Sequence, residues 1–92
     1  MERKRTRIDI IRDMLLAIQN KGGRIKPTHL MYKANLSHVQ MNSYLEDLME
    51  KGFVERISEE KTGNQYLILN ERGHGFIQKL REMKAFEESF GL

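Results

Sequence analysis

Residues 27–69 read PTHLMYKANLSHVQMNSYLEDLMEKGFVERISEEKTGNQYLIL, and the order of local signals in this stretch decides the fold. The first signal is a proline, which suits the opening position of a helix, and we expect a short helix over residues 27–34. A turn at residues 35–36 follows. Ser37 then forms a capping box with Gln40, because each side chain can satisfy a free backbone N–H of the other residue. The stretch therefore predicts two helices joined by a tight turn.

A hairpin follows the second of these helices. Lys51 and Gly52 end the helix, since a cation and a glycine both suit a helix C-terminus. Residues 53–57 and 65–69 are predicted to be strands, and the loop between them is polar. Helix, turn, capped helix and hairpin in this order are typical of a winged helix, whose second helix is shaped to enter the major groove of DNA. The predicted fold class is α+β and mostly helical, with a three-helix core, a two-stranded wing and a C-terminal dimerisation helix.

Two further helices flank this stretch. Thr6 can cap a first helix, and Asn70 can cap a last helix that runs to about Phe90. Ninety-two residues make one domain, with a small core that a partner subunit would help to stabilise. We expect the domain to comprise a basic arm (1–6), a winged helix (7–69) and a C-terminal helix (70–92). The buried stripe of the first helix is expected to comprise Ile8, Ile11, Leu15 and Ile18.

The charge of the chain is unevenly distributed. Residues 1–36 carry nine Lys/Arg against three Asp/Glu (+6), residues 37–69 carry three against six (−3), and residues 70–92 carry four of each, which gives the net +3. A local positive field attracts phosphates. There is no cysteine, and no apolar run approaches the roughly 20 residues that cross a membrane. The basic start is not followed by a long apolar stretch, so we expect no secretory signal, no membrane partner and a cytoplasmic protein associated with the nucleoid.

The helix that begins after Ser37 supplies the candidate base contacts. With Met41, Leu45 and Leu48 facing the core, its outer side in the first two turns carries four side chains that suit base edges or phosphates. Acidic residues occupy the outer side further along, and no Lys or Arg lies between residues 37 and 50. The four candidates are Val39, Gln40, Asn42 and Ser43, and Gln40 has a competing task in the capping box.

Cations elsewhere in the sequence must then supply the phosphate contacts. They lie in the N-terminal arm, around the helix at residues 27–34, and on the wing. Each alone can equally be a solvated surface charge, whereas together they predict a phosphate-binding ring. The candidates are Arg3, Lys4, Arg5, Arg24, Lys26, Lys33, Arg56 and Lys61.

The last helix carries a stripe that predicts a dimer interface. Four apolar residues recur with steps of 4, 3 and 7, which is the heptad spacing of a coiled-coil seam, with Glu87 at the missing position. Two residues widen the apolar face of the first helix and are expected to join the same interface. The six interface candidates are Ile10, Met14, Phe76, Leu80, Met83 and Phe90. The alternative is that the stripe folds back onto its own chain.

The chain also resembles a known family. Its motifs are Arg24-Ile25, ANLSH (34–38), YLEDLMEKGFVE (44–55) and LNERGHGFIQKL (69–80). In these it is similar to the archaeal small winged helix-turn-helix proteins, of the type that dimerises through an antiparallel coiled coil. The resemblance implies a homodimer that binds double-stranded DNA. One departure is the short last helix of about 20 residues, which implies a short dimer contact.

Catalysis is not expected from this sequence. The three histidines show no metal-binding spacing, and there is no nucleophile–base pair or phosphate loop, so we expect no enzyme activity, no metal, no cofactor and no small-molecule ligand. The first hypothesis is a DNA-binding homodimer, either a transcription regulator or an architectural protein. The alternative is a winged helix used as a protein–protein interaction module, which the acidic outer half of the second motif helix favours.

Overall fold

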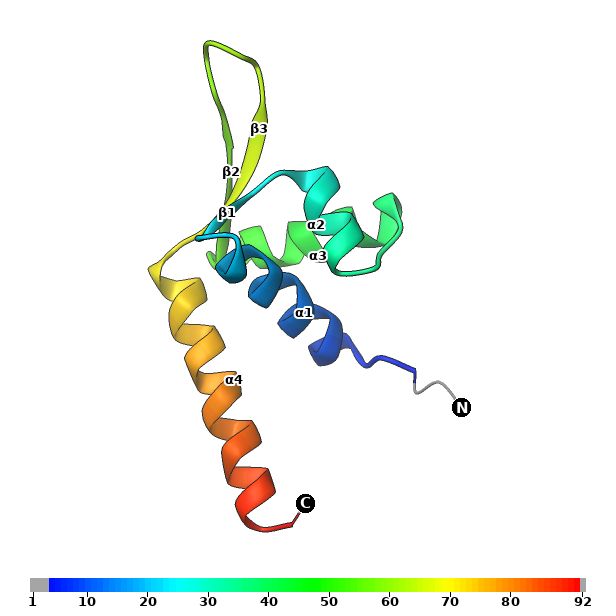
Figure 1. The fold of residues 1–92 in the computed structure, drawn as a ribbon, viewed down its shortest axis with the longest axis vertical. Helices are drawn as coiled ribbons and strands as arrows, with labels where there is room; N and C mark the ends of the chain where they lie inside the picture. The colour runs from blue at the N-terminus through cyan, green and yellow to red at the C-terminus, as the bar shows by residue number, and fades with distance from the viewer. Residues whose placement is uncertain (1–3, 92) are drawn as a thin grey trace.

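The computed structural model describes residues 4–91 of the chain. Three helices and a small sheet form the body, and a long helix leaves it toward the C-terminus (Figure 1). This arrangement is the mostly helical α+β winged helix-turn-helix that the sequence predicted. In chain order the elements are α1 (Arg7–Asn20), β1 (Arg24–Ile25), α2 (Pro27–Lys33), α3 (His38–Glu50), β2 (Val54–Ser58), β3 (Gln65–Leu69) and α4 (Glu71–Ser89).

Side-chain caps start three of the helices where the sequence predicted them. Thr6 caps α1, and the side chain of Asp9 completes a capping box by accepting from the Thr6 backbone N–H. Ser37 caps α3 through a capping box with Gln40, and Asn70 caps α4 by accepting from Gly73. Such caps are local interactions between residues three positions apart, which is why a sequence pattern identifies them.

The turn between α2 and α3 depends on a left-handed residue. Asn35 has a φ of 53°, and the chain then reverses so that the Leu36 N–H donates to the Met31 carbonyl at 3.0 Å. Asparagine tolerates this conformation better than other non-glycine residues do. Gly52 plays the same part after α3, with a φ of 76° and the next N–H, of Phe53, donating to the Leu48 carbonyl at 3.0 Å.

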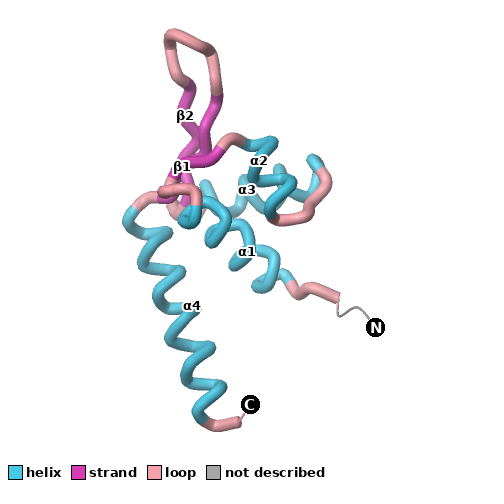
Figure 2. The backbone as a smooth tube through the Cα atoms, viewed as in Figure 1, coloured by secondary structure: helices cyan, strands magenta, loops and turns pink. Residues whose placement is uncertain are grey.

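The sheet has three strands rather than the two that the sequence predicted. Its order is β1-β3-β2, all antiparallel, and Figure 2 draws the strands in magenta at the base of the wing. The short strand β1 pairs Arg24 with Ile68 and Ile25 with Leu67. The hairpin β2–β3 is the predicted wing. The two residues of β1 are too few to show the alternation of apolar and polar residues by which a strand is recognised in a sequence. The strand forms through its hydrogen bonds with β3. The consequence is that the base of the wing is tied directly to the segment entering α2.

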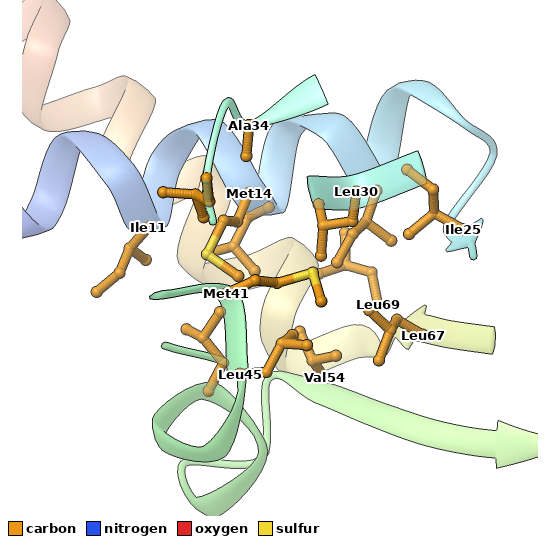
Figure 3. Close-up of a cluster of buried hydrophobic side chains, with 14 of the residues drawn as sticks. Ile11, Met14, Ile25, Leu30, Ala34, Met41, Leu45, Val54, Leu67 and Leu69 are labelled. Carbon is orange, nitrogen blue, oxygen red and sulfur yellow. The ribbon is translucent and has the colours of Figure 1, made fainter. Parts of the chain in front are cut away.

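One apolar core joins α1, α2, α3 and the sheet. Leu15, Leu30 and Leu45 have no exposed surface, and the buried face of each strand contributes one or two residues. Met14 also lies in this core, close to Met41 in Figure 3, and its side chain is 0% exposed. The prediction of Met14 as part of an exposed interface is therefore wrong, because the body of the fold covers that side of α1.

A close backbone approach fixes the start of α4. A Cβ built on Gly73 would lie 2.4 Å from the Phe53 carbonyl oxygen and 2.5 Å from a Leu69 methyl carbon. Asn70 strengthens the same junction, since its side-chain amide also donates to the Gly52 carbonyl at 2.6 Å. The first turns of α4 are thus held against the end of α3 and the end of β3.

Only the first half of α4 packs against the body. Ile77 and Leu80 are buried, and Phe76 stacks on Phe53 with ring centroids 4.6 Å apart. The prediction that Leu80 lies at a dimer interface is therefore wrong, because Leu80 is buried within its own chain. Phe76 is half-buried by its contact with Phe53. Ile77, which the seam pattern omitted, takes part in the packing. From residue 81 onward every described position of α4 is exposed, because α4 and α1 diverge (Figure 1).

Candidate nucleic-acid interface

The outer face of α3 is exposed to solvent at its start. Val39 is 78% exposed, and Ser43, one turn later, is also exposed. Gln40 is exposed as well, but its side-chain oxygen accepts from the Ser37 N–H at 3.0 Å in the capping box. An apolar side chain and a hydroxyl thus face solvent at the end of α3 that approaches base edges in helix-turn-helix proteins.

Asn42 has a partner that the sequence reasoning missed. Its side-chain amide nitrogen lies 3.2 Å from Nδ1 of His38, one turn earlier on α3. His38 itself is exposed. When Nδ1 accepts this hydrogen bond, the other ring nitrogen carries the proton and is a donor at the tip of α3. The i,i+4 spacing is the signal that identifies this pair.

The acidic second half of α3 is partly neutralised. Asp47 forms ion pairs with Arg7 of α1 and with Lys51, the latter at 2.5 Å. Arg7 also lies over the Tyr44 ring, 5.5 Å from its centroid. Glu46 and Glu50 are exposed. Their charges repel phosphates, which confines any contact with DNA by α3 to its first two turns.

The two predicted cations of the wing are exposed, whereas Arg24, on β1 beside the base of the wing, is held by neighbouring side chains. Lys61 is exposed at the wing tip, and Arg56 is exposed on β2 with its guanidinium donating to Gln65 at 3.2 Å. Arg24 lies at the base, stacked over the Tyr66 ring at 3.7 Å and ion-paired with Glu59 at 3.2 Å. Arg24 is therefore positioned by an aromatic face and a carboxylate.

The described cations of the N-terminal arm differ in their surroundings: one is exposed and one packs against the fold. Arg3 lies outside the described residues, and Lys4 is exposed. Arg5 is folded back: its guanidinium donates to the carbonyls of Ala34 and Asn35 at 2.6 and 2.8 Å, and pairs with Asp13 at 3.1 Å. The prediction of Arg5 as part of a free arm is corrected here, because these contacts use its donors inside the fold.

The segment around α2 brings other candidates together. Lys26 is the N-cap residue of α2 and Lys33 lies in its last turn, and both are exposed. Tyr32 is 74% exposed and was not singled out from the sequence. It falls off the apolar stripe formed by Leu30 and Ala34, and that departure is a signal that would have identified it. The structure thus places cations on both sides of the helix-turn-helix.

Neither a membrane-spanning helix nor a metal-binding cluster occurs among residues 4–91. Over that range, no helix combines the length and the apolar character that crossing a bilayer requires. The same range holds no cluster of three or more His, Cys, Asp or Glu with the geometry of a metal site.

Comparison with known proteins agrees with this arrangement. A family model described as winged helix-turn-helix matches residues 4–88. No curated protein sequence matches the chain. Among solved structures the chain is similar to Sso10a-2, a DNA-binding protein from Sulfolobus solfataricus, with 20% identity and a TM-score of 0.78 over 94% of this chain and 85% of that one. It is also similar to F93 from STIV, a winged-helix DNA-binding protein, with 18% identity and a TM-score of 0.73 over 91% and 92%.

At these identities the two solved structures establish a shared fold. The family model goes further, because it matches the sequence itself from the arm to the last turn of α4. The elements that it spans include the capped recognition helix and the hairpin described above. The chain belongs to the winged helix-turn-helix family.

Proposed function

We propose that the protein binds double-stranded DNA by placing the start of α3 in the major groove and the wing beside it. The observation that carries this proposal is the outer face of α3, where the side chains of Val39 and Ser43 are exposed. A valine can contact a thymine methyl group, and a hydroxyl can bond to a base or a phosphate. The two DNA-binding proteins that share the fold support the same reading.

Charge around the helix-turn-helix supports the proposal. Lys26 and Lys33 lie on the α2 side, and Arg56 and Lys61 lie on the wing. Phosphate contacts of this kind position the protein on the duplex without reading its sequence. Exposed cations also release condensed counterions when they bind DNA, which makes the affinity depend on salt.

We further infer that the protein is a homodimer joined through the second half of α4. Met83, Phe86 and Phe90 are 58%, 62% and 68% exposed and follow one another with steps of 3 and 4. The Phe86 and Phe90 rings lie 4.9 Å apart and form one apolar patch. This patch replaces the predicted interface, of which it keeps Met83 and Phe90. Ile10, half-buried against the core, is left out.

The occupant of this patch is a second copy of the same chain. A two-fold interface sets each patch against itself and counts every contact twice. An antiparallel arrangement also matches charge, because residues 79–84 carry Lys79, Arg81 and Lys84 against one acid, whereas residues 87–88 are both glutamates. The resemblance to proteins that dimerise through such a helix supports the same assembly.

The protein-interaction alternative rests on a specific observation. Glu46 and Glu50 give the outer half of α3 a negative surface that suits a basic protein partner. Fluorescence anisotropy with labelled genomic fragments and random duplexes, at low and at moderate salt, separates the two functions. A DNA-binding protein shows an affinity that falls steeply with salt. Absence of binding at low salt would overturn the DNA function and favour the interaction module. Preference for some fragments indicates a regulator, and equal binding to all indicates an architectural protein.

A further inference from the structure

A groove between α1, β1 and α2 is a charged surface that lies apart from α3 and includes Lys26 and Lys33, the two α2-side cations of the proposed function. It consists of two adjoining hollows of about 360 and 540 Å³, which share Lys21, Ile25 and His29 as lining residues. In Figure 1 the end of α1 and the segment from β1 to α2 meet here, at the base of the wing. We call it the α1–α2 groove.

The groove concentrates positive charge. Its lining includes four cations and no carboxylate, so its formal charge of +4 exceeds the +3 of the whole chain. Within residues 4–91, one of the four forms an ion pair, and the other three have no acidic partner. A hollow lined by three cations without an acidic partner attracts anions, because low-dielectric walls focus the field. The four cations are Lys21, Arg24, Lys26 and Lys33.

Rigid elements hold these charges in place. Ile25 forms an apolar floor and is 2% exposed. Tyr66 supports the guanidinium of Arg24, whose carbon lies 3.7 Å from the ring centroid. His29 and Lys33 are one turn apart and therefore project from the same side of α2. A supported guanidinium and several ammonium groups around one hollow are the donor set that phosphate groups prefer.

The groove is separate from the reading surface of α3. In Figure 3, α1 lies on one side of the core and α3 on the other. Met41 and Leu45 turn the inner face of α3 toward that core, so Val39 points away from α1. A ligand in the α1–α2 groove therefore leaves the exposed face of α3 free.

We propose that the α1–α2 groove is a phosphate-binding site. Its ligand is a phosphate-bearing anion, supplied either by the backbone of a nucleic acid or by a free polyphosphate. The proposal does not depend on sequence reading by α3, because its residues lie on α1, β1, α2 and β3. Arg24 lies on β1 at the base of the wing, and Lys33 lies at the end of α2. A ligand that contacts both residues would restrain the base of the wing relative to α2.

The test is a titration of the ¹⁵N-labelled full chain with pyrophosphate in low salt, followed by amide chemical shifts. We expect progressive shifts at Lys21, Ile25 and His29, while the amides of α4 beyond residue 81 stay unchanged. Lys21→Gln/Lys33→Gln should bind pyrophosphate about tenfold more weakly, because two charge-assisted contacts are lost. Lys79→Gln/Lys84→Gln removes the same charge from α4 and should bind as the wild type does. Absence of groove shifts, or equal weakening in both variants, overturns the proposal.

A second titration with a short DNA duplex identifies the source of the phosphate. Groove shifts that pyrophosphate reverses assign the site to the DNA backbone, whereas shifts with pyrophosphate alone assign it to a free anion. The DNA function is judged in the same spectra from the amides of Val39 and Ser43. A lack of shifts at Val39 and Ser43 would count against the placement of α3 in the major groove and would leave the pyrophosphate shifts of the α1–α2 groove intact, so the two proposals fail separately.

Discussion

The guanidinium of Arg5 donates to the carbonyl oxygen of Ala34 at 2.6 Å, across 29 residues of sequence. Ala34 is the C-cap residue of α2, where a helix leaves carbonyls without internal partners. Arg5 also donates to the Asn35 carbonyl, at the one non-glycine position of positive φ within residues 4–91. The chain before α1 therefore holds the turn between α2 and α3 in place.

We expect Arg5→Ala to lower the free energy of unfolding by about 1–2 kcal/mol, because charged hydrogen bonds to partly exposed carbonyls are lost. Arg5→Lys should recover only part of this, since an ammonium lacks the planar fork. Urea denaturation measures both, with Lys4→Ala as a control expected to match the wild type. A stability unchanged by Arg5→Ala, together with weaker DNA binding, would restore Arg5 to the role of a free DNA-binding arm.

Two glycines of α4 should respond to alanine in opposite directions. Gly73→Ala places a methyl group 2.4 Å from the Phe53 carbonyl oxygen, and we expect a loss of about 1–3 kcal/mol as the junction shifts. A Cβ added at Gly75 would meet open space, with no atom within 4 Å, so Gly75→Ala should stabilise the helix by about 0.5–1 kcal/mol. Thermal or urea unfolding of the two variants measures this. If Gly73→Ala left the free energy of unfolding unchanged, the close approach of α4 to the Phe53 carbonyl would be contradicted.

Base reading should depend on the first two turns of α3. If the protein is sequence-specific, Asn42→Ala or Ser43→Ala should weaken its preferred site by about 1–3 kcal/mol and leave random DNA unchanged. Glu46→Gln, one turn further on, should instead strengthen binding to every sequence, because a repelling charge is removed. Anisotropy on preferred and random duplexes measures each. Equal losses on all sequences for Asn42→Ala would indicate backbone binding only.

Assembly should depend on the far half of α4. The wild type is expected to sediment as a dimer, and Met83→Glu or Phe86→Glu should give a folded monomer, because each large apolar side chain contributes about 1.5–3 kcal/mol when buried. Ala85→Glu adds the same charge to the opposite side of the helix and should remain dimeric. Leu80→Glu is unsuitable as a test, since Leu80 is buried within its own chain. A wild type that is monomeric at micromolar concentration contradicts the proposed dimer.

The sequence predicted the elements of this fold better than the surfaces between them. The caps at Thr6, Ser37 and Asn70 were identified because each joins residues three apart. Helical spacing gave an apolar face for α1, yet Ile8 is 40% exposed and Met14 is fully buried. The spacing of apolar residues identifies which face of a helix is apolar. How much of that face is buried depends on the neighbouring elements of the fold, which the spacing does not reveal.

The candidate site shows the same division. The stripe of α4 is continuous in sequence, but divergence from α1 divides it into a packed half with Leu80 and an exposed half with Phe90. The exposure of Val39 followed from the helical wheel alone. The fold-back of Arg5 and the stacking of Arg24 on Tyr66 are contacts between distant segments, which no local pattern encodes.

Asn70 lies at the pivot of α4, where its amide acts together with the close seat of Gly73 and the stacking of Phe76 on Phe53. The Asn70 side chain caps α4 and donates to Gly52 at the end of α3, so it helps to set the angle between these two helices. Nineteen helical residues extend about 28 Å from that pivot. A tilt of about 5° there moves the far tip by roughly 2.5 Å. In the proposed dimer the displacements from the two subunits add. A small repacking around Gly52 therefore changes the distance between the two copies of α3. That distance sets the spacing of the DNA half-sites that the dimer can bind.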